Sequence, residues 1–158
     1  MKNIKIIFIA LMPIVLGSSC SSDDDSPTEP TENEMASGTY QLVELGITPE
    51  QDIDGDGTST SNALSELTCA TGTLTLNADA SFEWAFTSLA VTSITGGLFN
   101  IACTSNTITL SGTWQVQGNT LTLFEGVETT NFSINGDTLT NNSGGELPEF
   151  SAVVYEKQ

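Results

Sequence analysis

Apolar and polar residues alternate with a period of two along most of this chain after residue 35. The clearest segment, residues 108–116, reads ITLSGTWQV, with apolar residues or glycine at the even positions and polar residues at the odd ones. A period of two is typical of a β-strand with one buried face, because successive side chains point to opposite faces. Stripes with the helical period of 3.6 are scarce by comparison. The pattern therefore predicts an all-β fold.

Short turn sequences join these segments into hairpins. Gly118-Asn119 follows one residue after the segment above and is typical of a two-residue turn, which predicts that Val116 lies opposite Leu121. The same arrangement recurs in FSINGDTLT, where the turn predicts that Ile134 pairs with Leu139. Both pairs place apolar side chains on one face of the sheet.

A third hairpin is predicted over residues 74–86, LTLNADASFEWAF. A three-residue loop at 78–80 places Leu76 opposite Phe82. Loops of this length favour glycine at the residue with left-handed backbone, so Ala80 is either strained or the turn is of another type.

Adding a first strand over Thr39–Leu45 and a last strand over Ala152–Glu156 brings the number of strands to about eight. The segment 88–104 holds either a strand near Leu98–Ala102 or a long loop. Consecutive hairpins predict an antiparallel up-and-down meander, which removes its exposed edges by closing into a barrel. A β-sandwich is the alternative.

The first 19 residues differ from the rest and read as a signal peptide. Lys2 and Lys5 precede an eleven-residue apolar run, residues 6–16, which is too short for a comfortable membrane span, and small residues follow it. The sequence LGSSC then resembles a bacterial lipobox. That resemblance implies that Cys20 becomes the N-terminus and carries acyl chains such as palmitate, which anchor the protein in the outer membrane. An ordinary signal peptide with a chance cysteine is the alternative.

Residues 20–35 predict an acidic, disordered tether between the anchor and the folded domain, residues 36–158. The run Asp23-Asp24-Asp25 is followed by two prolines, and no apolar residue occurs before Met35. Such a segment buries too little surface to offset the entropy of ordering. An acidic run behind a lipidated cysteine also resembles the signal that exports some Gram-negative lipoproteins to the cell surface; a plain solvated spacer is the other interpretation.

Charge excludes several functions. The chain has 20 acidic residues against three lysines, with no arginine and no histidine, for a net charge of −17. Because nucleic-acid binding needs cations to neutralise phosphates, we expect no nucleic-acid partner. Catalysis with a histidine base is also excluded, and isolated glutamates on strands are usually solvated. We therefore expect no enzyme activity.

The remaining two cysteines form an even pair in an exported chain, which favours a Cys69–Cys103 disulfide. Such a bridge closes a loop of roughly 35 residues and contributes about 3–4 kcal/mol in the chain-entropy model. Two buried free thiols are the alternative.

The order of several short motifs resembles bacterial lipocalin-like lipoproteins. These motifs are Gly38-Thr39-Tyr40, LTLNADASF, SGTWQVQGNTLTL, FSINGDTLT and the terminal VVYEKQ, and together they cover most of residues 38–158. The chain departs from the family at Tyr40, where tryptophan is usual, at Ala80, where glycine is usual, and in lacking the arginine that packs under the tryptophan. The resemblance implies a barrel that binds or carries a small apolar ligand.

Five aromatic residues are candidates for lining such a ligand pocket, although their alternation with polar residues also fits plain core packing. They are Tyr40, Phe82, Trp84, Phe86 and Trp114.

An acidic loop is the one motif with metal chemistry. The sequence DIDGDG places carboxylates of Asp52, Asp54 and Asp56 at the first, third and fifth loop positions, with glycine at the sixth, as in calcium loops. Thr58 could supply a carbonyl ligand. The twelfth position, which needs a bidentate glutamate, is alanine, so further candidate ligands are Asn62 and Glu66, and no flanking helices are evident. We expect structural calcium; an acidic turn bent by its glycines is the alternative.

The sequence thus predicts a monomeric envelope lipoprotein that binds a small apolar ligand. The alternative function is a structural or interaction module of the outer membrane, with a filled core that docks proteins or glycans.

Overall fold

A computed structural model describes residues 31–142 and 150–158, which form two short helices and nine strands. The helices are α1 (Glu32–Ala36) and α2 (Ala63–Glu66). The strands are β1 (Gly38–Gln51), β2 (Thr60–Asn62), β3 (Gly72–Leu76), β4 (Ser81–Ser93), β5 (Phe99–Gln117), β6 (Thr120–Glu125), β7 (Glu128–Asn135), β8 (Thr138–Asn141) and β9 (Ala152–Lys157). Within this part of the chain, no helix has the length and apolar character needed to cross a bilayer.

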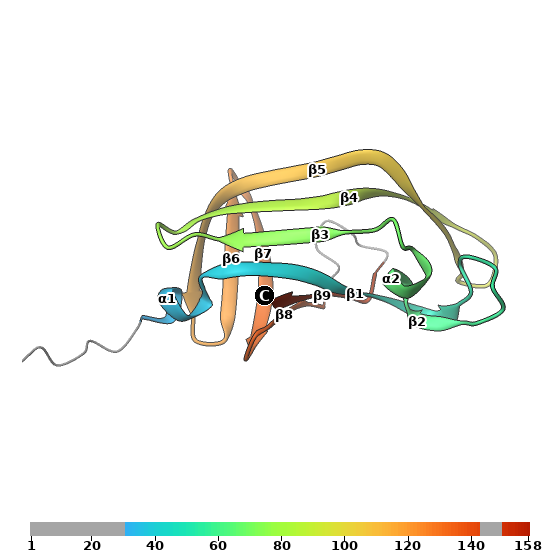
Figure 1. Ribbon diagram of the computed structural model, residues 1–158, viewed down its shortest axis with the longest axis horizontal. Coiled ribbons are helices and arrows are strands. Elements are labelled where there is room, and N and C mark those ends of the chain that lie inside the picture. Colours follow the sequence, from blue (N-terminus) through green and yellow to red (C-terminus); the bar gives the residue numbers. More distant parts are fainter. Residues whose placement is uncertain (1–30, 143–149) are drawn as a thin grey trace, which may run out of the picture.

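The strands form an antiparallel up-and-down barrel (Figure 1). Strands β3 to β9 follow one another in sequence order, and β1 pairs with both β3 and β9. This double pairing of β1 joins the two edges, so eight strands close on themselves and β2 is a short addition at one end of β1. The predicted all-β meander is confirmed, and the β-sandwich alternative is wrong because the sheet has no open edge at β9.

The predicted hairpin registers are confirmed. Val116 lies opposite Leu121, and Ile134 lies opposite Leu139. In the third hairpin, Leu76 pairs with Phe82, and Ala80 has a φ of 63°, which is the left-handed conformation that the loop length required. The backbone thus keeps the glycine-type turn and places an alanine in it.

The segment 88–104, which the sequence left open, belongs to one long hairpin. Strand β4 continues to Ser93 and β5 begins at Phe99, and the two pair from Ser81–Thr113 to Ser93–Phe99 with an irregularity between Thr87 and Leu89. The long-loop interpretation is therefore wrong, and the strand near Leu98–Ala102 is present. This hairpin extends along the upper side of the barrel in Figure 1.

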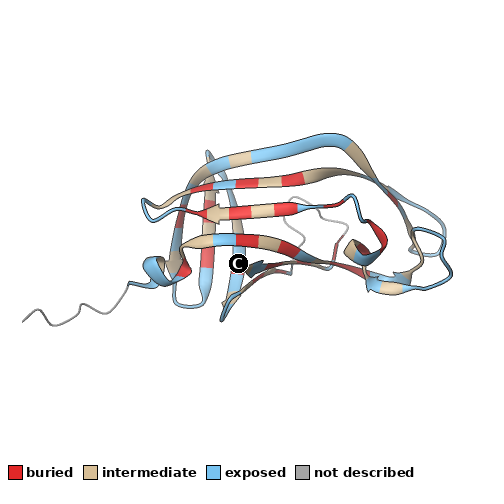
Figure 2. Cartoon of the chain, viewed as in Figure 1, coloured by how far each residue is buried: buried red, intermediate tan, exposed pale blue. Residues whose placement is uncertain are grey.

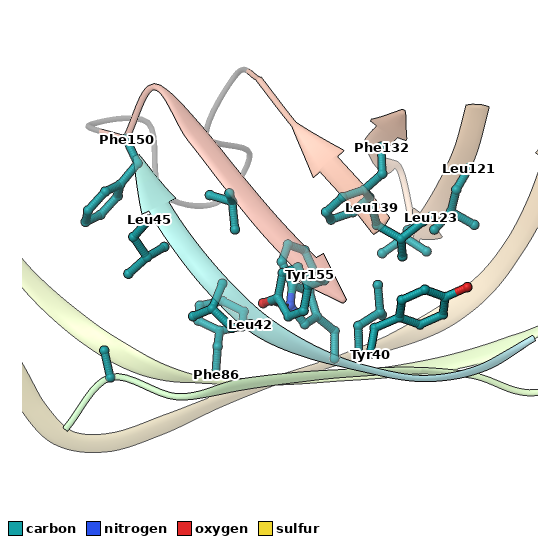
Figure 3. Packing of buried hydrophobic residues seen from close by; sticks show 14 of the residues in the cluster. Tyr40, Leu42, Leu45, Phe86, Leu121, Leu123, Phe132, Leu139, Phe150 and Tyr155 are labelled. Carbon is teal, nitrogen blue, oxygen red and sulfur yellow. Dashed lines mark hydrogen bonds between the residues drawn. The ribbon is translucent and has the colours of Figure 1, made fainter. Parts of the chain in front are cut away.

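Buried residues face the inside of the barrel, as the predicted period of two requires. On β3 and β4, buried positions alternate with more exposed ones (Figure 2). Side chains from strands on opposite sides of the barrel meet in the interior, including Leu42, Phe86, Phe132 and Tyr155 (Figure 3). Burial of apolar surface of this kind is the main favourable contribution to folding.

The end of the predicted tether is ordered, which corrects the boundary at residue 35. Residues 32–36 form α1, and Thr31 and Glu34 make a capping box: the Thr31 side chain accepts from the Glu34 amide, and the Glu34 side chain accepts from the Thr31 amide. The hydrogen bonds that the Thr31 amide and the Thr31 hydroxyl donate to the Glu34 carboxylate lower the pKa of Glu34. The T-x-x-E signature was readable in the sequence, but one turn of helix is too short to show a period. Residues 20–30 lie outside the described residues.

Candidate functional site

All five aromatic candidates belong to the buried core of the barrel, and Tyr40 is 2% exposed. Phe82, Trp84, Phe86 and Trp114 are each at most 4% exposed. The Trp84 ring lies 5.1 Å from Phe86 and 5.7 Å from Phe132, measured between ring centroids. These contacts are those of a packed core, the alternative that the alternation pattern allowed.

A hydrogen bond lies in the middle of this aromatic cluster. The Trp84 Nε1 donates to the hydroxyl oxygen of Tyr155 over 2.6 Å, and the Tyr155 ring is T-shaped to both Trp84 and Phe132. Burial raises the pKa of Tyr155 to about 12, although the bond from Trp84 acts in the opposite direction. The hydroxyl is therefore a neutral group at physiological pH, satisfied inside the barrel.

Tyr40, the fifth candidate, lines a pocket at the end of the barrel that α1 covers. We call it the mouth pocket; its volume is about 310 Å³, and it opens to solvent. Glycines of the β5–β6 and β7–β8 turns form part of its wall, which places it where the strands end. Its lining residues are Glu32, Met35, Ala36, Tyr40, Val116, Gly118, Asn119, Ile134 and Gly136.

Hydrogen bonds hold α1 over this pocket from several sides. The side-chain oxygen of Asn33 accepts from the Val116 amide over 3.0 Å, and Glu32 accepts from the Gly118 amide over 3.2 Å. At the other end of the helix, the Lys157 ammonium donates to the Met35 carbonyl over 2.8 Å, and the Tyr40 hydroxyl donates to the Ala36 carbonyl over 2.8 Å. The helix therefore forms a cover for the mouth pocket.

Most residues that line the mouth pocket cannot be recognised as pocket residues from the sequence. Val116 and Ile134 were recognised as inward strand positions, but nothing in their spacing distinguishes a residue at the barrel end from one in the packed middle. Met35 and Ala36 were assigned to the tether and to the start of the domain. The capping box before them was the available signal that these apolar residues begin a structured, packed segment.

The structure brings together three carboxylates of the predicted metal loop. Oxygens of Asp52, Asp54 and Glu66 all lie within 4.8 Å of one another. The loop is shaped by its own side chains: Asp52 accepts from the amides of Gly55 and Gly57, over 2.7 and 2.9 Å. Both glycines have positive φ, 81° and 92°, which glycine adopts without steric cost.

Glu66 is brought to this loop by α2. It is 9% exposed, and its Oε2 accepts from the amides of Ile53 and Asp54 over 3.1 and 3.4 Å. The sequence showed no flanking helix because α2 has only four residues, begun by an Asn62 cap. The described acidic cluster offers the carboxylate oxygens that a hard cation binds.

Asp56 lies outside this carboxylate cluster, and the remaining candidate ligands make hydrogen bonds of their own. Asp56 accepts from the Thr58 amide over 2.7 Å, which uses both residues to shape the loop. The Asn62 side-chain oxygen accepts from the amides of Leu45 and Leu64, each over 3.0 Å, so it caps α2 and ties it to β1. Among the candidate carboxylates, those of Asp52, Asp54 and Glu66 therefore come together.

The predicted disulfide is confirmed: Cys69 and Cys103 are bonded, with Cα atoms 6.2 Å apart. It joins the segment between α2 and β3 to β5. That segment and the loop between β1 and β2 lie at the same end of the molecule (Figure 1). The alternative of two free thiols is wrong. The third cysteine, Cys20, lies outside the described residues, as does the predicted signal peptide.

No protein-family model, curated protein or solved structure matches the chain at a significant level. The closed eight-strand barrel is compatible with a lipocalin-like fold. The mouth pocket and the acidic cluster are two places in the described barrel where side chains gather in a way that could serve a ligand.

Proposed function

We propose that this chain is a lipid-anchored protein of the outer membrane whose lipocalin-like barrel binds one small apolar ligand in the mouth pocket. It acts as a monomer and by binding rather than by catalysis. The observation that carries the proposal is the pocket itself: about 310 Å³ of space, lined by five apolar or aromatic side chains, where the strands end. That volume lies at the lower end of the range for small-molecule sites, roughly 300–1,000 Å³.

A titration with the apolar fluorescent probe N-phenyl-1-naphthylamine tests ligand binding. The full chain is used with Cys20→Ser, which removes the acylation site so that no detergent is needed. We expect a saturable rise in fluorescence. Ile134→Trp, which fills the mouth pocket, should weaken binding by about tenfold, equivalent to roughly 1.4 kcal/mol.

Ile108→Trp is the matched control, because Ile108 is 38% exposed and lies outside the pocket lining. Its binding curve should match that of the parent chain. Melting curves establish that each variant is folded. Absence of saturable binding, or equal binding by the Ile134 variant, would contradict the proposal.

The packed interior supports a second candidate function. With Trp84, Phe132 and Tyr155 in mutual contact, the middle of the barrel is occupied by side chains. Under this alternative the chain is a structural or interaction module that docks envelope proteins or glycans. Failure of the probe to bind a folded chain favours it.

The anchor and its location are part of the proposal and rest on the lipobox-like LGSSC and the acidic residues that follow. Intact mass should show acyl chains on Cys20, and Cys20→Ser should abolish that added mass. Digestion of intact cells with an added protease distinguishes surface display from an inward-facing location. An unmodified Cys20 would contradict the anchor.

We further propose that Asp52, Asp54 and Glu66 bind calcium and thereby stiffen the loop. Their converging carboxylates support this assignment, and the cation would offset the repulsion among three neighbouring negative groups. The role is structural, because the cluster joins the end of β1 to α2 close to the disulfide.

Thermal melts with calcium chloride and with EGTA test this site. Calcium at ten times its dissociation constant stabilises a folded chain by about 1.4 kcal/mol, or roughly 4–6 °C for a domain of this size. Asp54→Asn should abolish the difference, whereas Asp137→Asn, an exposed acid in the β7–β8 turn, should retain it. Equal melts in the two buffers would exclude the metal.

A further inference from the structure

The charges around the mouth pocket are unevenly distributed. Glu32 is the only charged residue among those that line it. Its carboxylate is fixed at the pocket wall by the hydrogen bond from the Gly118 amide, 3.2 Å long. The pocket therefore combines an apolar wall with one negative group.

The neighbouring groups reinforce this asymmetry. Asp137 directly follows the lining residue Gly136, and its charge contributes, after burial, to the raised pKa of Tyr40. Lys157 is the one lysine among the described residues, and its ammonium is engaged by the Met35 carbonyl and lies 5.8 Å from the centroid of the Tyr40 ring. It therefore holds α1 and does not line the pocket.

We infer that the ligand of the mouth pocket is an amphiphile whose head group is a protonated amine, with an apolar stem of about ten heavy atoms. This inference rests on the proposed binding function. The size follows from the volume of about 310 Å³ at roughly 30 Å³ per heavy atom, the share of a water molecule in the liquid. An anionic head group placed beside Glu32 would be repelled, whereas an ammonium would be attracted.

Because Glu32 is exposed, the attraction is modest. Solvent-exposed ion pairs typically contribute up to about 1 kcal/mol, or about fivefold in affinity. The stem supplies most of the binding through burial against Met35, Val116 and Ile134, and the head group supplies selectivity.

Three probes with ten carbon atoms each test the inference: decylamine, decanol and decanoate, each measured by displacement of N-phenyl-1-naphthylamine from the full Cys20→Ser chain. We expect decylamine to bind about three- to tenfold more tightly than decanoate, with decanol between them. Glu32→Gln, which keeps an oxygen able to accept from Gly118, should weaken decylamine about two- to fivefold, leave decanol unchanged and strengthen decanoate.

Glu83→Gln is the matched control, because it makes the same change of charge at an exposed position on β4, outside the pocket lining. It separates a local effect from the general attraction of cations to an acidic protein and should leave all three affinities unchanged. Decanoate bound as tightly as decylamine, or equal effects of the two glutamate variants, would overturn the inference while the binding function stands. If none of the three probes displaces a dye that does bind, the inference is likewise overturned, whereas a dye that does not bind contradicts the proposed function itself.

Discussion

Ala80 occupies a backbone position that glycine would adopt with less strain. Its φ of 63° lies in the left-handed region, where the Cβ of an L-residue approaches the carbonyl oxygen. The conformation persists because the loop is fixed by hydrogen bonds on both sides, from the Asn77 amide to the Ser81 carbonyl and from the Ala80 amide to the Asn77 carbonyl. One residue is therefore strained so that Leu76 and Phe82 keep their register.

We predict that Ala80→Gly stabilises the protein by about 0.5–1 kcal/mol, since relief of left-handed strain exceeds the entropic cost of glycine. Urea unfolding measures the shift. Ala78→Gly in the same loop is the control: Ala78 is not among the residues with positive φ, so this change should be neutral or destabilising. Equal shifts for both variants would show that the backbone at Ala80 is not strained.

Tyr155 presents a second property of a single residue, a dependence of stability on alkaline pH. The phenol of the unfolded chain has its ordinary pKa of about 10, whereas in the folded chain the pKa of Tyr155 is raised to about 12. Below pH 10 both states are protonated, and stability is unaffected. As pH rises from 10 to 12, only the unfolded state ionises, so the folded state should lose about 3 kcal/mol relative to it.

Tyr155→Phe should flatten this alkaline decline, leaving a smaller part from Tyr40, whose pKa is also raised by burial. At neutral pH the same variant should cost about 1–3 kcal/mol, because the Trp84 Nε1 loses its acceptor in the interior. Urea unfolding at several pH values separates the two effects. If the Tyr155→Phe variant loses as much stability between pH 10 and 12 as the parent chain, the loss comes from other groups.

At the scale of elements, strands were more predictable than helices. Hairpin registers such as Val116–Leu121 follow from local turn chemistry and a period of two, both of which a short segment displays in full. Helices α1 and α2 have five and four residues, so neither shows a period. They were missed for that reason, although Thr31 and Asn62 are good cap residues.

The two candidate sites differ in the same way, because one depends on local spacing in the sequence and the other on how distant strands pair. Asp52 and Asp54 were found because their ligand spacing is local. The mouth pocket brings together α1, β1, the β5–β6 hairpin and the β7–β8 hairpin, and this combination exists only after β1 pairs with β9. No local pattern in the sequence contains that information.

The disulfide joins two segments that do not pair with each other as strands of the barrel. We predict that Cys69→Ala with Cys103→Ala destabilises the protein by about 3–4 kcal/mol, because the unfolded chain gains the entropy of an open loop of roughly 35 residues. Urea unfolding measures the difference, and unfolding of the parent chain in reducing agent should reproduce it. A loss below about 1 kcal/mol would contradict the loop-entropy account.

For the whole molecule, closure depends on the path of β5. This strand pairs with β4 up to Thr113 and with β6 from Thr113 onward, so it passes between two sides of the barrel. Gly112 lies at this change of partner. A Cβ there would collide with the Phe124 carbonyl and lie 2.9 Å from the Phe82 ring.

Gly112→Ala should therefore destabilise the barrel by about 2–3 kcal/mol, since rigid backbone must move to accept one methyl group. Thermal and urea unfolding measure the change. Ser111→Ala, at the exposed neighbouring position, should lie within about 0.5 kcal/mol of the parent. A Gly112 variant as stable as the Ser111 variant would show that β6 can shift away.

The position of α1 also decides how the molecule bears mechanical load. Any tension transmitted along the chain from the residues before Thr31 reaches α1 before it reaches the barrel. The helix is held by a few hydrogen bonds to Val116, Gly118 and Lys157, whereas β1 is paired along both edges, with β3 and β9. Tension applied from that side should detach α1 first and leave the sheet intact. The helix that covers the mouth pocket is therefore the first element that we expect to unfold under tension.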